Sequence, residues 1–159
     1  MFNSIRSVLA LCVVASACYQ SQVPISTQAT PFDRALVGTW QSLEDDDDVM
    51  SVLQFDNGFY YIEMPWGLGP ADTTRLRARA YLTNVAGAEF VNVQEIQGEN
   101  RAYSFFRLTR HPDGSISLVP LKDMPTFPSS LELHAYLREH VHDRAIYDNE
   151  ARFTKISSR

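Results

Sequence analysis

Cysteine is nearly missing from this chain of 159 residues. The sequence has only two, Cys12 and Cys18, and both precede residue 19. The remainder of the chain can therefore form no disulfide and no cysteine-ligated metal site, so its fold must depend on a hydrophobic core. The composition allows this, because 45% of the residues are hydrophobic and 21% are charged, which is ordinary for a single globular domain with short appendages.

Basic residues are also scarce. The 14 lysines and arginines stand against 19 acidic residues, for a net charge of −5, and the sequence has no long basic stretch. The electrostatic footprint of a nucleic-acid-binding protein is therefore missing. The sequence also lacks a serine nucleophile elbow, a phosphate-binding glycine loop and an HExxH zinc motif. These absences predict no nucleic-acid partner, no cofactor and no metal, and they make an enzyme the least favoured function.

Two groups of polar residues are nevertheless candidates for metal binding. Residues 44–48 are all acidic, but they lack the alternating spacing and the glycine of a calcium loop, and contiguous acids repel one another. The second group is His134, His140 and His142. On a helix, His140 and His142 would point about 200° apart, so they do not share a face. We favour a solvated loop for the acids and surface or helix-end positions for the histidines.

Long hydrophobic runs are lacking as well. The longest near the N-terminus, residues 8–15, is too short to span a bilayer. It follows Arg6, the single charge of this region, and it precedes the small residues Ser16 and Ala17. This order of charged, apolar and small residues predicts a signal peptide over residues 1–17. The alternative is a buried N-terminal helix, which the absence of a polar face disfavours.

Residues 14–18, Val-Ala-Ser-Ala-Cys, resemble the lipobox of bacterial lipoproteins. The resemblance implies that Cys18 receives a diacylglycerol, that the leader is cut before it, and that its new amino group is acylated. Each buried methylene contributes about 0.8 kcal/mol, so palmitate-type chains would hold the protein firmly on a membrane of the cell envelope. Tyr19 is not the aspartate that retains such proteins in the inner membrane of enterobacteria, which, for a Gram-negative source, favours the outer membrane facing the periplasm. The alternative is cleavage after Ala17 and a soluble secreted protein.

The rest of the chain divides into a tether and one domain. Residues 19–32 are rich in Ser, Thr, Gln and Pro and carry no charge, so we predict a flexible tether over residues 18–32, counting the lipidated Cys18. An edge strand is the alternative, and Pro24 and Pro31 disfavour it. Residues 33–159 form the predicted domain.

The domain reads as mainly β. Alternating or β-branched and aromatic segments, separated by turn signals such as Asp56-Asn57-Gly58, predict about eight strands. The expected strands cover residues 36–43, 49–55, 59–64, 75–85, 89–96, 102–109, 115–121 and 151–156. One helix is expected before the last strand, because Ser129 and Glu132 fit a capping box and Leu133, Leu137 and Val141 recur every four residues. Short connections favour an antiparallel meander that closes into a barrel.

Residues 36–40, Leu-Val-Gly-Thr-Trp, resemble the Gly-x-Trp signature on the first strand of lipocalins and related calycin barrels. The resemblance implies a lipocalin-like barrel in which Trp40 plugs the closed end and a basic residue of the last strand, Arg152 or Lys155, packs over its ring. Such a cation–π contact contributes about 0.5–2 kcal/mol. Much of the domain also resembles uncharacterised bacterial proteins that open with Leu-Val-Gly-Thr-Trp, a likeness that implies no activity.

Two further features are candidates for contacts with a ligand or partner. Arg75, Arg77 and Arg79 alternate with apolar residues and therefore share one face of a strand. They fit an anionic ligand, a lipid headgroup or a protein, or else an ordinary solvent face balanced by Glu89 or Glu95. Trp66, in a loop rich in Gly and Pro, fits the lip of a cavity or a lid over the core.

These observations leave two leading functions. The first is an envelope lipoprotein whose β-barrel binds a small apolar or amphipathic ligand. The second is an envelope interaction or structural lipoprotein that recognises another protein through its surface and carries no ligand. We favour the first, on the analogy of fold that the Trp40 motif provides.

Overall fold

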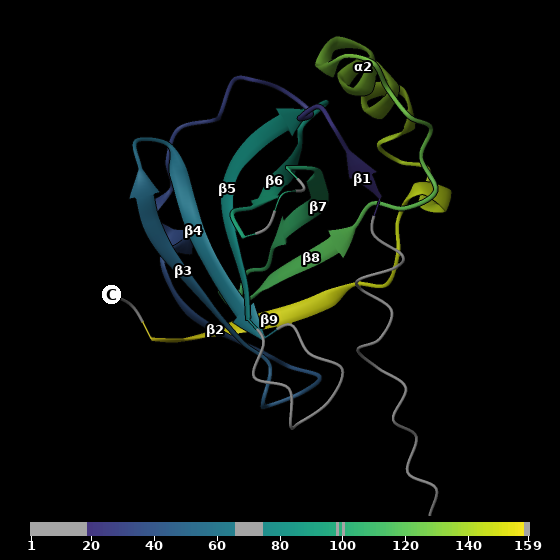
Figure 1. Ribbon diagram of the computed structural model, residues 1–159. Coiled ribbons are helices and arrows are strands. Elements are labelled where there is room, and N and C mark those ends of the chain that lie inside the picture. Colours follow the sequence, from purple (N-terminus) through teal and green to yellow (C-terminus); the bar gives the residue numbers. More distant parts are fainter. Residues whose placement is uncertain (1–18, 66–74, 98, 100, 158–159) are drawn as a thin grey trace, which may run out of the picture.

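Eight antiparallel strands form a closed barrel in the computed structural model, which describes residues 19–65, 75–97, 99 and 101–157. Each strand pairs with the next along the chain, and the last pairs with the first, so the sheet follows a ring (Figure 1). The strands are β2 (Gly38–Ser42), β3 (Val49–Asp56), β4 (Phe59–Pro65), β5 (Arg75–Val85), β6 (Ala88–Glu95), β7 (Tyr103–Arg110), β8 (Ile116–Pro120) and β9 (Ala151–Ser157). The predicted mainly-β fold, with eight strands in a closed meander and a helix before the last one, is confirmed.

The connections alternate between the two ends of the barrel because neighbouring strands run in opposite directions. At one end, here called the hairpin end, lie three short connections, 57–58, 86–87 and 111–115. Glycine provides positive φ in each of them, at Gly58, Gly87 and Gly114. At the opposite end, here called the loop end, lie the connection 43–48 and the described residues of 96–102. Strand β4 ends and β5 begins at this end, and the connection 121–150 starts and finishes there.

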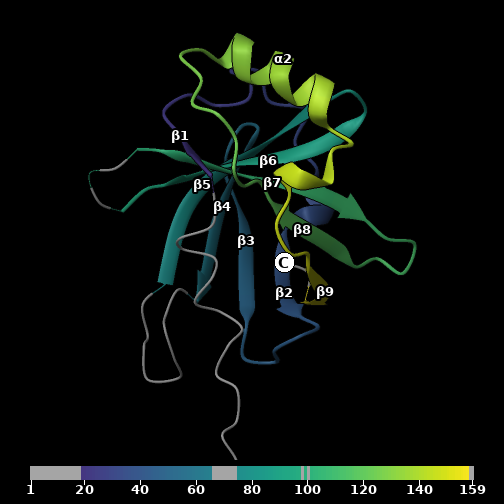
Figure 2. The ribbon, with the colours of Figure 1, turned by 90° about the vertical axis from the view of Figure 1, so that its right-hand side faces the viewer.

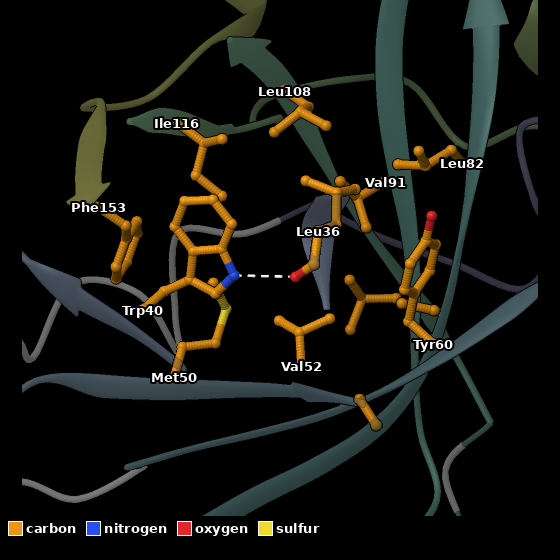
Figure 3. Packing of buried hydrophobic residues seen from close by; sticks show 13 residues of the cluster. Leu36, Trp40, Met50, Val52, Tyr60, Leu82, Val91, Leu108, Ile116 and Phe153 are labelled. Carbon is orange, nitrogen blue, oxygen red and sulfur yellow. Dashed lines mark hydrogen bonds between the residues drawn. The ribbon is translucent and has the colours of Figure 1, made fainter. Parts of the chain in front are cut away.

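Period-two alternation sets the inner wall of the barrel. On β5, Ala78, Ala80 and Leu82 face inward and are almost fully buried, whereas Arg77 and Arg79, on either side of Ala78, face outward. Inward side chains from the other strands, such as Trp40 and Phe153, complete an apolar core (Figure 3).

A second core lies outside the barrel, under helix α2 (Ser130–His140). The helix lies over the outer wall (Figure 2), and its buried residues Leu133 and Leu137 belong to one cluster with Phe90 of β6 and Phe105 of β7. It begins as predicted, since the Ser129 hydroxyl accepts a hydrogen bond from the backbone N–H of Glu132. A short 3₁₀ helix, η2 (Arg144–Ile146), then leads back to β9. No helix of the described residues is long and apolar enough to cross a bilayer.

Residues 19–32 do not form the predicted flexible tether but lie along the outer wall of the barrel. Strand β1 (Gln20–Ser21) pairs with the start of β7, and the Tyr19 backbone N–H donates to the carbonyl of Leu121 over 2.8 Å. The disfavoured edge strand is therefore present, although it covers only two residues. Pro24 does not prevent it because the proline lies beyond the paired residues.

One buried asparagine explains how this segment is held. Asn92 of β6 is fully buried, its side-chain oxygen accepts from the backbone N–H of Ile25 over 2.9 Å, and its amide donates to the Thr83 hydroxyl over 3.0 Å. Ile25 is itself fully buried in the second core. A buried amide must be paired, so Asn92 fixes the course of the N-terminal segment at this point. The polar composition of residues 19–32 predicted a flexible segment, because composition does not show that a single buried residue such as Ile25 can hold it in place.

Candidate functional site

The hairpin end of the barrel is closed around Trp40. A short 3₁₀ helix, η1 (Arg34–Leu36), precedes β2, and the indole Nε1 of Trp40 donates to the carbonyl of Leu36 over 2.9 Å (Figure 3). The ring is only 3% exposed, and the inward side chains of Met50 and Phe153 belong to the same cluster. The indole therefore satisfies its polar group while its apolar surface fills this end of the barrel.

Lys155, and not Arg152, is the basic residue of the last strand that lies over Trp40. Its Nζ lies 5.0 Å from the ring centroid and donates to the carbonyls of Ala35 and Val37, over 2.6 and 2.8 Å. These carbonyls belong to the last turn of η1, where a cation is favoured. Arg152 faces outward instead and donates to the side chains of residues 113 and 115 in the β7–β8 hairpin.

A second set of polar contacts holds the other side of η1. Asp33 caps the helix by accepting from the Ala35 N–H, and it also accepts from Arg110 over 2.6 Å. Arg110 in turn donates to both carboxylate oxygens of Glu89, over 2.8 and 3.1 Å, and this contact is the main reason that the pKa of Arg110 is raised. The Tyr60 hydroxyl accepts from the Asp33 N–H over 2.8 Å, and burial raises the pKa of this phenol.

These four residues, Asp33, Tyr60, Glu89 and Arg110, form a clamp that was not predicted from the sequence. The four residues come from η1's cap, β4, β6 and β7, so no spacing along the chain connects them. The only local signal was Asp33 ahead of a short turn, a pattern too common to single out a site.

The loop end differs, because solvent reaches the inner wall there. Six inward-facing apolar side chains of the barrel strands are only partly buried, and each lies at the middle of its strand or nearer the loop end. They are Ile62, Met64, Leu76, Phe106, Leu118 and Ala151. They come from opposite sides of the ring, β4 and β5 on one and β7 to β9 on the other. The described inner wall is thus filled by Trp40 and held by polar contacts at the hairpin end, and it is apolar and partly exposed toward the loop end.

The three arginines of β5 lie on the outer wall. Arg75 and Arg77 share one carboxylate, that of Glu63 on β4, with Nε–oxygen distances of 2.6 and 3.8 Å. A hydrogen bond from Tyr61 is the main cause that lowers the pKa of Glu63, and the contact with Arg75 lowers it further. Arg79 donates to the side chain of Gln94 over 3.1 Å.

The predicted counter-charges of this row, Glu89 and Glu95, are wrong. Glu89 lies in the clamp at the hairpin end, and Glu95 pairs in register with Ala78, whose side chain belongs to the inner core. Because side chains alternate between the two faces of a strand, Glu89 and Glu95 both face the inside of the barrel, away from the arginines. Because the arginine row faces outward, a ligand or partner that contacts it must lie outside the barrel. Cys18 and Trp66 fall outside the described residues.

The acidic and histidine groups do not come together as a metal site. Within the described residues no three His, Cys, Asp or Glu side chains lie where they could hold an ion. In the acidic loop, burial and the neighbouring Asp45 raise the pKa of Asp48, which reflects the repulsion expected of contiguous acids. His140 stacks on Tyr136 with ring centroids 4.0 Å apart.

One serine–histidine pair was not predicted. His111 Nε2 lies 2.7 Å from the hydroxyl of Ser117 and 4.0 Å from a carboxylate oxygen of Glu150. Ser117 is fully buried, so no substrate reaches its hydroxyl. The serine and the carboxylate also face the same ring nitrogen, whereas a catalytic triad places them on opposite nitrogens. This pair therefore has a structural role.

Comparisons of the chain with protein-family models, with curated proteins and with solved structures found no match.

Proposed function

We propose that this protein binds a small apolar or amphipathic ligand against the inner wall of its barrel, and that the ligand enters at the loop end. The observation that carries the proposal is the partial exposure of inward-facing apolar side chains of the barrel strands, such as Met64, Leu76 and Phe106, from the middle of the barrel to the loop end. Ligand sites are concave and mostly apolar, and the mouths of β-barrels are common places for them. The hairpin end is blocked by Trp40 and by the clamp around Asp33.

A second candidate function uses the outer wall. The arginine row lies next to Phe55, which is 53% exposed and stacked on Tyr61. Arginine and aromatic residues dominate protein interfaces, so this wall suits a protein partner with acidic groups. This function needs no ligand in the barrel.

Two variants on neighbouring positions of β5 separate the two functions. Leu76 faces inward and Arg77 faces outward. We expect the substitution Leu76→Gln to weaken binding of the neutral apolar fluorophore Nile red about tenfold, because a polar amide replaces apolar surface worth roughly 1.4 kcal/mol. We expect Arg77→Gln to leave that binding unchanged. Fluorescence titration of the full chain measures both.

The opposite pattern would reject the barrel as the site. If Arg77→Gln weakened the binding of Nile red and Leu76→Gln did not, the dye would sit on the outer wall. If the protein without either substitution bound no Nile red at all, the second candidate function would replace the first.

We also propose that Cys18 is acylated and holds the protein on a membrane of the cell envelope. The order of charged, apolar and small residues in 1–17, followed by Cys18, supports this. We expect the intact mass of the protein extracted from membranes to include a diacylglycerol and a further acyl chain on a chain that starts at Cys18. We expect Cys18→Ser to abolish this added mass. A mature protein with an unmodified cysteine, or one found in the soluble fraction, would contradict the proposal.

A further inference from the structure

The loop end of the barrel is strongly acidic. The connections 43–48 and 96–102 of this end contain six acidic residues and one arginine, all within the described residues, for a net charge of −5. This equals the net charge of the whole chain, so the rest of the sequence is neutral overall. Lys122, at the start of the connection 121–150, is already paired, because its Nζ lies 3.7 Å from a carboxylate oxygen of Asp148.

One acidic side chain of this end belongs to the inner wall. Glu95 is the last residue of β6, its register partner is Ala78, and Val93 precedes it on the same face. Ala78 and Val93 are both part of the inner core. Among the described residues Glu95 has no ion pair or side-chain hydrogen bond. A carboxylate thus stands at the rim of an apolar wall, beside a residue as small as alanine.

The cations of the inner wall are all engaged elsewhere. Within the described residues they are Arg110 and Lys155, and both lie at the hairpin end. Arg110 is held by Glu89 and Asp33, and Lys155 is held by the carbonyls of η1. A fatty acid that enters from the loop end with its carboxylate at the rim therefore meets no available cation on the inner wall, and six acidic residues outnumber the one arginine of the two connections around it.

We propose that the barrel selects an amphiphile with an apolar chain and a cationic head group, and that Glu95 faces the head group at the rim. The proposal rests on the proposed ligand-binding function. A rim of one sign of charge raises the local concentration of counter-charged ligands and repels ligands of the same sign. This selection weakens as salt screens the rim.

Displacement of Nile red by three ligands of equal chain length tests the proposal: dodecylamine, dodecanol and dodecanoate, at monomeric concentrations and pH 7. On the full chain we expect dodecylamine to displace the dye at about one tenth of the dodecanoate concentration, with dodecanol between them. We expect this difference to shrink in high salt. Butylamine, which has the same charge but a short chain, should not displace the dye.

Matched variants locate the selecting group. We expect Glu95→Gln to reduce the preference for dodecylamine over dodecanoate about threefold, as the loss of one partly exposed charge contact predicts. The control Glu139→Gln makes the same chemical change on the exposed face of α2 and should leave the preference unchanged. Circular dichroism checks that no ligand unfolds the protein.

The outcomes distinguish this proposal from the function on which it rests. Equal displacement by all three ligands, or a preference for dodecanoate, would overturn the cationic selection and leave the ligand-binding function standing. An unchanged preference in Glu95→Gln would overturn the role of that residue. Failure of the chain to bind Nile red would reject the ligand-binding function itself.

Discussion

Replacement of Trp40 by alanine is expected to lower the free energy of unfolding by about 4 kcal/mol, the middle of the range for a buried tryptophan. The ring fills the hairpin end, and its Nε1 donates to Leu36. Removing it leaves a cavity between Met50 and Phe153, an unpaired carbonyl at the end of η1, and Lys155 without its aromatic partner. Since domains of this size have only about 5–15 kcal/mol of stability, we expect a large fraction to unfold under mild denaturing conditions. Urea titration followed by far-UV circular dichroism measures the loss.

Two further variants separate the ring from its polar atom and from general effects of mutation. Trp40→Phe keeps an aromatic ring but loses the indole N–H, so we expect a loss of about 1–2 kcal/mol from the unpaired Leu36 carbonyl and the smaller ring. Leu131→Ala removes a large apolar side chain that is 79% exposed on α2, and we expect a change within about 0.5 kcal/mol. If Trp40→Ala cost no more than Leu131→Ala, the indole would not be what closes the hairpin end.

The strand pattern made most of the fold predictable from the sequence. Along β5 each outward arginine alternates with an inward apolar residue, and only one pairing register keeps Ala78 and Ala80 inside. Short glycine turns such as 57–58 then force neighbouring strands to be antiparallel. The resemblance to lipocalins predicted that a basic residue of the last strand lies over Trp40. Spacing along the sequence did not decide between Lys155 and Arg152.

The features that escaped prediction depend on contacts between distant parts of the chain. Asn92 is one of several polar residues of β6, and nothing in its own segment indicates that it accepts from the backbone of Ile25. Arg110 likewise reaches Asp33, 77 positions away, only once the barrel has closed. The counter-charge of the arginine row was assigned to β6 because the pairing of β4 with β5, which places Glu63 opposite Arg77, was not considered. In the first two cases the missing information was how the segment before β2 lies against the barrel, and in the third it was the register, which sets which side chains meet across a sheet.

Gly38→Ala is expected to destabilise the protein by about 3 kcal/mol, combining backbone strain with a forced close contact. Gly38 has a φ of +145°, a conformation that L residues rarely adopt, and a Cβ there would lie 2.4 Å from the carbonyl oxygen of Ser157. That oxygen belongs to the backbone of β9, which pairs with β2 through an irregular register next to Trp40. It cannot retreat without disturbing the pairing that closes the barrel. The same Cβ would also press on the stem of Lys155, 3.0 Å away.

A matched glycine separates the contact from the strain. Gly58 also has a positive φ, +84°, but a Cβ there would meet no atom within 4 Å. We therefore expect Gly58→Ala to cost only the conformational strain, about 1–2 kcal/mol. Equal losses in the two variants, measured by urea titration, would show that the approach of β9 to Gly38 is not tight. A greater loss at Gly38 would mean that the glycine of the Gly-x-Trp pattern is required because it lets the last strand reach the first, which places Lys155 over Trp40.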